Sequence, residues 1–405
     1  MRILFITDNF PPEVNAPAAR TYDHCKRWVE QGAEVTVITC APNFPQGKVY
    51  EGYKNSFCNT ELVDGIKVVR VWSYISPNEG FIKRIMDYIS FAFMAFWAGL
   101  FKPCDIIIAT SPQFFTTFTG WSLAKLKRRP WVFELRDLWP ESIITVGAMK
   151  RSFAIKVFEK IEHFMYRSAD MIIPVTDAFK NHLISRDIPA DKIHVVTNGV
   201  DPKTFPKTEK NQKLIMKLGL TDKFVISYIG THGMAHGLDF IINCLPRIAD
   251  PSIHFLFVGD GAAKKNAQDH AEKLSLTNVT FLPPVSKDEV SEYVALSDAV
   301  LVPLKKSDTF KSVIPSKIFE SAVMQKPILL GVDGQAREIV EEFEAGLYFE
   351  PENEAEFLKA VSEIKNNKKL FADIQAGEEK LARAYDRNDL ADKMFSYVSL
   401  LVRPK

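Results

Sequence analysis

A lysine and a glutamate one helical turn apart have the spacing that most directly suggests chemistry in this sequence. Pro315 has no backbone N–H and its fixed φ suits the first turn of a helix, so a helix is expected to open at Ser316 and Lys317. Free amides at a helix start attract a diphosphate. Lys317 adds a positive charge there, and Glu320 can accept both hydroxyls of a ribose. The spacing suits a nucleotide-sugar site and, equally, an ordinary solvated ion pair.

Two turns place a glycine directly after an apolar run. Gly230 is followed by Thr231, and a glycine here lets a phosphate approach the main chain, although a simple turn is also possible. Gly259 begins the motif GDG, as in a dinucleotide fingerprint, but Lys264 takes the place of the third small residue. We prefer a strand-to-helix turn for GDG, and such a turn can still lie against a nucleotide.

Both turns belong to a chain in which short Val/Ile/Phe-rich runs alternate with helical stretches. This alternation predicts an α/β fold with parallel sheets covered on both faces. The expected strands are residues 2–7, 34–40, 67–73, 105–111, 131–137, 171–176 and 194–198, and then 224–230, 254–259, 279–285, 299–304 and 327–332. Ligands of such sheets collect at the carboxyl ends of the strands, where both turns lie.

A polar segment with two prolines at 201–211, DPKTFPKTEKN, has the composition of an interdomain linker. We therefore expect an N-terminal Rossmann-like domain over residues 1–203 and a C-terminal one over residues 204–385, with sheets facing a central cleft. A final helix, about residues 386–405, is expected to pack back on the first domain.

Composition limits the partners. The 405 residues are 46% hydrophobic and 25% charged, enough for two ordinary cores, and a net charge of +1 makes nucleic acid an unlikely partner. Five scattered cysteines without a CxxC pair favour a reducing cytoplasm. The opening MRILFIT continues directly into a strand pattern, unlike a signal peptide.

An apolar stretch at residues 89–101, ISFAFMAFWAGLF, is shorter than the roughly 20 residues that span a bilayer. Lys83 and Arg84 before it and Lys102 after it suit a helix at a membrane surface. A helix buried against a sheet is the alternative. Region 83–102 is thus the candidate peripheral contact with the inner face of the plasma membrane.

A set of short motifs resembles the retaining glycosyltransferases of family 4, which have the two-Rossmann GT-B fold. The motifs are PPE at 11–13, APNFPQGKVYEGY at 41–53, ELRDLWPES at 134–142, NGVD at 198–201, VGDG at 258–261, PSKIFE at 315–320 and GVDGQAREIV at 331–340. RDLWPES and PNFPQGK are most similar to the branch that assembles bacterial surface polysaccharides such as O-antigen or capsule. That branch moves N-acetylated amino or deoxyamino sugars to lipid-linked acceptors.

The resemblance implies that the second domain binds a UDP-sugar. Glu320 matches the family's ribose-binding glutamate, whereas Ser312 replaces the first glutamate of that motif. Thr231 and His236 stand where an arginine and a lysine usually hold the diphosphate. Lys311 and Lys317 are the nearest substitute cations, and we prefer Lys317 because it lies at the expected helix start. The remaining expected nucleotide-sugar contacts are Ser316, Lys311, Gly230, Gly259, Val285 and Glu338. For the charged ones, a solvated position is the alternative.

In the first domain the resemblance implies catalytic candidates after one predicted strand. Asp137 ends WVFELRD, where the family has a polar residue near the acceptor and the anomeric carbon. Glu141 is either an acceptor base or the cap of the adjacent Trp-Pro turn. Asn15 stands at the family's glycine-rich loop near the diphosphate. Arg20, one turn later, either reaches into the cleft or covers apolar surface with its stem.

The sequence has no DxD triplet and no cluster with metal-ligand spacing, so no metal or other cofactor is expected. The hypothesis is a retaining transferase in which helix amides and Lys317 stabilise the departing diphosphate. Alternatives are a nucleotide-sugar epimerase of the same fold and a non-catalytic sugar-nucleotide-binding protein. An NAD-dependent oxidoreductase, resting on VGDG alone, is a further one.

Overall fold

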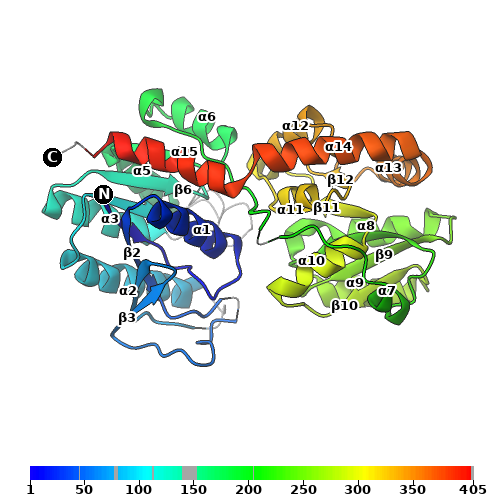
Figure 1. Ribbon diagram of the computed structural model, residues 1–405, viewed down its shortest axis with the longest axis horizontal. Helices are drawn as coiled ribbons and strands as arrows, with labels where there is room; N and C mark the ends of the chain where they lie inside the picture. The colour runs from blue at the N-terminus through cyan, green and yellow to red at the C-terminus, as the bar shows by residue number, and fades with distance from the viewer. Residues whose placement is uncertain (45, 77–80, 112–113, 139–152, 204, 403–405) are drawn as a thin grey trace. The chain divides into compact units, whose positions relative to one another are not determined.

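The computed structural model describes residues 1–44, 46–76, 81–111, 114–138, 153–203 and 205–402. Its contacts divide the chain into two compact units (Figure 1). The first unit comprises Met1–Asn198 and the chain from Arg387 onward, and the second comprises Gly199–Asp386. These divisions fall within a few residues of the boundaries expected from the sequence.

The first unit is built around a seven-stranded sheet in the order β3-β4-β2-β1-β5-β6-β7. Its strands are β1 Arg2–Ile6, β2 Glu34–Cys40, β3 Cys58–Val63, β4 Ile66–Val71, β5 Ile106–Thr110, β6 Trp131–Leu135 and β7 Met171–Pro174. Neighbours pair in parallel except β3 and β4, which form an antiparallel hairpin. Because β4 runs parallel to β2, the open end of the hairpin lies at the carboxyl edge of the sheet.

Helices cover both faces of this sheet, as the uniformly buried strands require. They are α1 Ala16–Glu30, α2 Phe81–Leu100, α3 Phe114–Lys127, α5 Phe153–Ser168, α6 Asp177–Ser185 and α15 Arg387–Leu400. Along β1, Leu4 and Ile6 enter one core while Ile3 and Phe5 enter the other. No helix in the described part of the chain is long and apolar enough to cross a membrane.

The C-terminal helix α15 lies beside α1 (Figure 1). The indole of Trp28 on α1 donates a hydrogen bond to the carbonyl of Ala391, 2.9 Å away, and Met394 is fully buried beside it. Leu400 is 75% exposed because it lies at the helix end.

One strand prediction for the first unit was wrong, and one strand was not predicted. Residues 194–198 run beside β7, and the amides of His194 and Val196 donate to the carbonyls of Ile172 and Pro174. Pro174 has no N–H to return a bond, so the parallel ladder cannot be completed and no strand forms. Conversely, β3 was missed because its sequence, CNTELV, is mostly exposed and lacks an apolar run.

The second unit has a six-stranded parallel sheet in the order β10-β9-β8-β11-β12-β13. Its strands are β8 Phe224–Ile229, β9 Ile253–Val258, β10 Val279–Leu282, β11 Ala299–Pro303, β12 Ile328–Gly331 and β13 Gly346–Tyr348, the last not expected from the sequence. Its α-helices are α7 Gln212–Lys217, α8 Leu238–Cys244, α9 Lys264–Lys273, α10 Lys287–Leu296, α11 Lys317–Val323, α12 Gln335–Glu342, α13 Glu354–Asn366 and α14 Lys368–Ala384. The segment expected as a linker packs on this unit, with Phe205 buried in its core and Lys210 paired with Asp298.

A buried ion pair joins α1 to the centre of the first sheet. Arg20 Nε lies 2.9 Å from Glu134 Oε1, and both side chains are almost fully buried. The guanidinium also donates to the carbonyls of Val196 and Thr197. One side chain therefore ties α1 to β6 and to the chain that follows β7.

Removing the Arg20 side chain should destabilise the protein strongly. We expect Arg20→Ala to lower the free energy of unfolding by about 3–5 kcal/mol, because Glu134 is left as an unpaired buried charge. Arg27→Ala, two turns later on α1, removes a partly exposed ion pair with Asp392 and should cost only about 0–1 kcal/mol. Urea unfolding of both variants measures the difference, and equal losses would contradict this role for Arg20.

Candidate active site

The second unit gathers several predicted site residues at the carboxyl edge of its sheet. β8 ends at Ile229 and β11 at Pro303, and α11 begins at Lys317 after the loop that follows β11. Lys317 reaches back from α11 to the end of β8, where it meets Gly230 and Tyr228. This is the edge at which open α/β sheets bind ligands.

The Lys317 ammonium lies over Gly230 and against an aromatic face. Its Nζ is 4.9 Å from the centroid of the Tyr228 ring, within the range of a cation–π interaction. A Cβ added to Gly230 would lie 2.9 Å from Nζ, so glycine leaves the space that the ammonium needs. Burial lowers the pKa of Lys317, opposed by the charge of Glu320. A half-buried cation with so little compensation favours the binding of an anion.

Glu320 lies one turn beyond Lys317 on α11 and is half-buried. Within the described residues its carboxylate accepts no hydrogen bond, and Lys317 is the charge that it influences. Both carboxylate oxygens are thus available to a pair of hydroxyl donors, which is the arrangement expected for a ribose.

The start of α11 offers fewer amides than the sequence suggested. The amide of Ile318 donates to the carbonyl of Pro315 at 3.2 Å. The amides of Phe319 and Glu320 both donate to the carbonyl of Ser316. Within the described residues, the amides of Ser316 and Lys317 are thus the ones at this helix start that make no hydrogen bond. Lys317, whose ammonium carries a full charge, is the main attraction for an anion here.

Two histidines after β8 are neutral at neutral pH. Burial, together with the nearby Lys317, lowers the pKa of His236 to about 4. Burial and Lys264 lower the pKa of His232 to about 4 as well. His236 therefore adds no positive charge beside Lys317. The exposed neighbour Thr231 contributes a carbonyl that accepts from the Tyr228 hydroxyl at 2.6 Å.

His232 and Tyr228 were missed by sequence reasoning. His232 is fully buried, and neither ring nitrogen has a hydrogen-bond partner within the described residues. Its ring lies beside those of Tyr228, Phe257 and Phe281. The sequence did carry one signal for an aromatic ring under this loop. Tyr228 is a polar aromatic residue near the end of an apolar strand, two residues before Gly230 of GTHG.

The motif GDG packs the loop after β9 against the loop after β8. A Cβ on Gly259 would lie 1.9 Å from the carbonyl oxygen of Gly230, and one on Gly261 would lie 2.5 Å from that of His232. The amide of His232 donates to the carbonyl of Asp260 at 2.8 Å. These glycines are required by contact between two loops, in agreement with the turn interpretation.

Lys311 lies in a different setting from Lys317. It is exposed and pairs with Asp308 at 3.0 Å and with Asp333 at 3.6 Å. It lines a pocket of about 240 Å³ together with Asp333 and Glu350. Because two carboxylates already compensate its charge, Lys311 is a weaker candidate than Lys317 for a diphosphate.

The remaining predicted contacts of the second unit are peripheral. Glu338 is exposed on the first turn of α12, and the neighbouring Arg337 pairs with Glu341. Ser316 caps α11 without a side-chain hydrogen bond. Ser312, in place of the family's first glutamate, donates to the carbonyl of Thr309. Val285 packs partly buried against the core of this unit after β10.

In the first unit, Asn15 and Arg20, both predicted to contact the nucleotide, instead stabilise the fold. Asn15 caps α1, accepting from the amide of Ala18 at 2.8 Å. The expectation that Arg20 reaches into a cleft is corrected, because its guanidinium is buried against Glu134 and backbone carbonyls. Asp137 follows β6, half-buried, and its amide donates to Ser111 Oγ. Glu141 lies outside the described residues.

A group of carboxylates at the same edge of the first unit was not anticipated. Glu13 is buried and accepts from the amides of Asn43 and Phe44 at 2.8 and 3.0 Å. Burial raises the pKa of Glu13 to about 7, and burial with the charge of Asp8 raises the pKa of Asp87 on α2 to about 7. Carboxyl groups with such pKa values can exchange protons near neutral pH.

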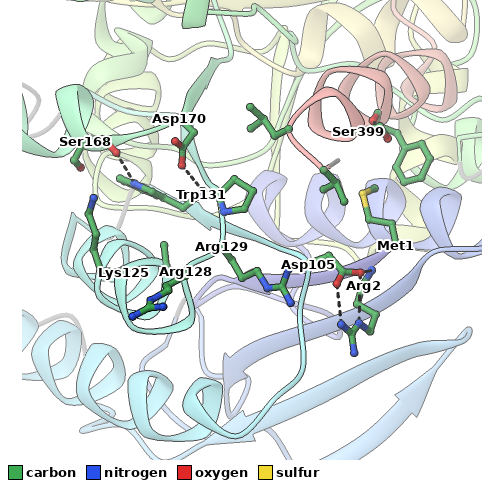
Figure 2. A pocket seen from close by; sticks show the side chains of 15 residues that line it. Met1, Arg2, Asp105, Lys125, Arg128, Arg129, Trp131, Ser168, Asp170 and Ser399 are labelled. Atoms are coloured by element: carbon green, nitrogen blue, oxygen red, sulfur yellow. Dashed lines mark hydrogen bonds and ion pairs between the residues drawn. The ribbon is translucent and has the colours of Figure 1, made fainter. Parts of the chain in front are cut away.

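A large pocket of about 1120 Å³ lies at the opposite, amino-terminal edge of the first sheet (Figure 2). Figure 2 shows Arg2 paired with Asp105 and the indole of Trp131 donating to the Ser168 carbonyl. Its position, away from the carboxyl ends of the strands, separates it from the candidate site. Among the residues whose placement is described, no group of His, Cys, Asp and Glu has the arrangement of a metal site.

Both halves of the chain match models of glycosyltransferase domains. Residues 15–199 match "Glycosyl transferase 4-like domain" and residues 210–380 match "Glycosyl transferases group 1". WcaI of Escherichia coli K12, a glycosyl transferase assigned to colanic acid biosynthesis, is 27% identical over 78% of this chain and 80% of its own. TuaH of Bacillus subtilis 168, assigned to teichuronic acid biosynthesis, is 24% identical over 66% of each chain.

Solved structures of similar fold include Anabaena HepE in complex with UDP and glucose. It superposes with a TM-score of 0.73 at 18% identity and covers 99% of this chain and all of its own. The two-domain fold of parallel Rossmann-like sheets is therefore GT-B, as expected from the sequence.

Closing the space at Gly259 should disrupt the loop contact. We expect Gly259→Ala to lower the free energy of unfolding by roughly 2 kcal/mol or more, because its Cβ would overlap the Gly230 carbonyl. Gly219→Ala is the control: it also has a positive φ, but nothing lies within 4 Å of its Cβ. Its cost should be about 1 kcal/mol or less from backbone strain alone. Similar costs for both variants, by urea unfolding, would argue against the contact.

The raised pKa of Glu13 predicts a measurable pH dependence. The folded protein keeps a proton on Glu13 up to about pH 7, whereas the ordinary pKa is 4.5. The stability contributed by this group is thus present below pH 4.5 and lost as the pH rises through 7. Glu13→Gln does not titrate, so its unfolding free energy relative to wild type should rise by about 2 kcal/mol between roughly pH 5 and 8. Parallel stability profiles would refute the raised pKa.

Proposed function

Because the chain is a glycosyltransferase of the GT-B fold, we propose that it moves a sugar from a UDP-sugar to a lipid-linked saccharide acceptor. The pathway we propose is bacterial surface polysaccharide synthesis, such as O-antigen or capsule, at the inner face of the plasma membrane. The names of WcaI and TuaH support a polysaccharide product, and UDP bound to HepE supports the donor. The transferred sugar in this proposal is an N-acetylated amino or deoxyamino sugar.

The observation that carries the proposal is the poorly compensated ammonium of Lys317 over Gly230. In the proposed complex, the diphosphate lies against Lys317 and the open main chain at Gly230, with His236 as a neutral hydrogen-bonding neighbour. Glu320 accepts the ribose hydroxyls one turn away. All of these groups belong to the second unit.

The proposed reaction proceeds with retention at the anomeric carbon. The glycosidic C–O bond to the diphosphate breaks, and the Lys317 ammonium stabilises the charge that develops on the leaving oxygen. The acceptor hydroxyl attacks from the same face and passes its proton to that oxygen, so the products are a glycoside and UDP. Asp137, after β6, is the proposed first-unit residue near the acceptor.

Metal independence is part of the proposal, since Lys317 supplies positive charge at the diphosphate. Transfer should therefore continue at an unchanged rate in excess EDTA. A rate that falls with EDTA and recovers on adding Mg²⁺ or Mn²⁺ would overturn this part.

The donor site predicts a clear pattern of UDP affinities. Lys317→Met removes the charge with little change in shape and should weaken UDP binding by about 10- to 100-fold, or roughly 1.4–2.8 kcal/mol. Glu320→Ala should abolish measurable binding of UDP while leaving the fold intact. Lys265→Ala, an exposed lysine on α9, is the matched control and should bind UDP like wild type. Isothermal calorimetry measures all three, and normal affinity in both site variants would exclude the proposed site.

The reaction itself is tested by mass spectrometry of products formed from a set of sugar nucleotides and synthetic polyprenyl-diphosphate sugars. A mass gain of one sugar on the acceptor, with the donor's anomeric configuration preserved by NMR, is the expected outcome. Conversion of UDP-N-acetylhexosamine to an isomer in the absence of acceptor would identify an epimerase instead.

A further inference from the structure

An apolar groove lies on the first unit between α2 and the open end of the β3–β4 hairpin. Its volume is about 700 Å³. The residues that line it are Phe57, Trp72, Met86, Ile89, Ser90, Phe93 and Met94. Several are unusually exposed for their type, with Phe57 at 77% and Phe93 at 60%. Contiguous exposed apolar surface of this kind marks a binding site.

The two walls of the groove follow from the local sequence. On the hairpin, Cys58 pairs with Val71, so Phe57 and Trp72 stand side by side just beyond the paired residues, and the Trp72 amide donates to the Phe57 carbonyl. On α2, Met86, Ile89 and Phe93 recur at helical spacing and face away from the core, in contrast to the buried Phe91. α2 packs on β2 and β4, which holds the walls together (Figure 1).

The lining of the groove is almost entirely apolar, so an occupant needs few polar groups to bind there. Ser90 is the one polar residue in its lining, and its hydroxyl is already bonded. The Ser90 Oγ accepts from the amide of Tyr74 at 2.7 Å and donates to the carbonyl of Asp87 at 2.8 Å. A partner protein would bring polar groups that need hydrogen bonds, about ten in a typical interface, whereas the polar groups in this lining are the Trp72 indole N–H and the Ser90 hydroxyl. A hydrocarbon chain needs none.

The groove opens toward the edge of the sheet where the chemistry of this unit lies. Trp72 directly follows the carboxyl end of β4, and Asp87, beside Met86 on α2, is close enough for its pKa to be raised by Asp8 after β1. Lys83, exposed one turn before Met86, supplies positive charge at this end of the helix. A chain lying in the groove would thus carry an anionic head group to the carboxyl edge.

We propose that this groove binds the polyprenyl chain of the acceptor, with its phosphate end near Lys83 and its outer isoprene units left in the bilayer. The inference rests on the proposed lipid-linked acceptor and adds the site that selects it. The lining combines aromatic rings with two methionines, which adapt to the kinks and methyl branches of a prenyl chain. The concave shape suits a single chain, whereas a flat bilayer surface would meet projecting side chains such as Phe101.

The test uses Trp72 as a built-in reporter in the full-length protein. Farnesyl diphosphate, added to the protein without vesicles, should shift tryptophan emission to the blue and saturate, and Trp72→Phe should remove most of this change. Saturating UDP must leave the titration unchanged, because the donor site is in the second unit. Inorganic diphosphate alone should give no shift.

Matched substitutions on α2 separate the groove from general surface adhesion. Phe93→Glu should raise the apparent Kd for farnesyl diphosphate at least about tenfold. Phe101→Glu adds the same charge directly after α2, at a phenylalanine that is 78% exposed and outside the lining, and should change the apparent Kd less than about twofold. Ile89→Glu serves as a second groove variant, and unchanged UDP affinity by calorimetry verifies that each variant is folded.

Other results would overturn the groove assignment without touching the proposed function. Equal losses in Phe93→Glu and Phe101→Glu would indicate a membrane-facing surface instead of a chain site. Tighter binding of a saturated alkyl phosphate of similar length would refute prenyl selectivity. No emission change with farnesyl diphosphate, while transfer to a short-chain acceptor proceeds, would exclude the groove and leave the transferase intact.

Discussion

The candidate donor site depends on two loop backbones that touch where no side chain fits. The Gly230 carbonyl occupies the space of a Cβ on Gly259, and the amide of His232 closes the contact on Asp260. This contact fixes the loop after β8, so that Gly230 presents an open main chain to Lys317. The ammonium can then sit over glycine with an aromatic ring on one side, uncompensated by an ion pair in the described residues. The close contact between Gly259 and the Gly230 carbonyl thereby positions the loop beside the Lys317 ammonium, which can attract an anion.

The two units offer opposite electrostatic settings. The second unit holds a cation and two neutral histidines, a setting that favours a diphosphate over protonated or cationic ligands. The first unit collects carboxyl groups with raised pKa values beside an apolar groove. Both settings lie at the carboxyl edges of Rossmann-like sheets that differ in strand number and order.

Much of the fold could be predicted because the central strands are buried on both faces and carry uninterrupted apolar runs, as in β5. Features decided by distant residues could not. Residues 194–198 fail as a strand because of Pro174 on the neighbouring strand β7, and Arg20 is buried because Glu134, 114 residues away, meets it. The placement of Lys317 and Glu320 one turn apart on one helix could be predicted from their spacing. Tyr228 and His232 escaped because their roles arise from the packing of separate loops.

The most direct test of the account is a crystal structure of the protein with bound UDP. The account predicts the diphosphate within hydrogen-bonding distance of Lys317 Nζ, next to the main chain of Gly230, and both ribose hydroxyls on the Glu320 carboxylate. A nucleotide bound elsewhere in the second unit, with Lys317 still lying on Tyr228 and no phosphate near it, would contradict the central claim.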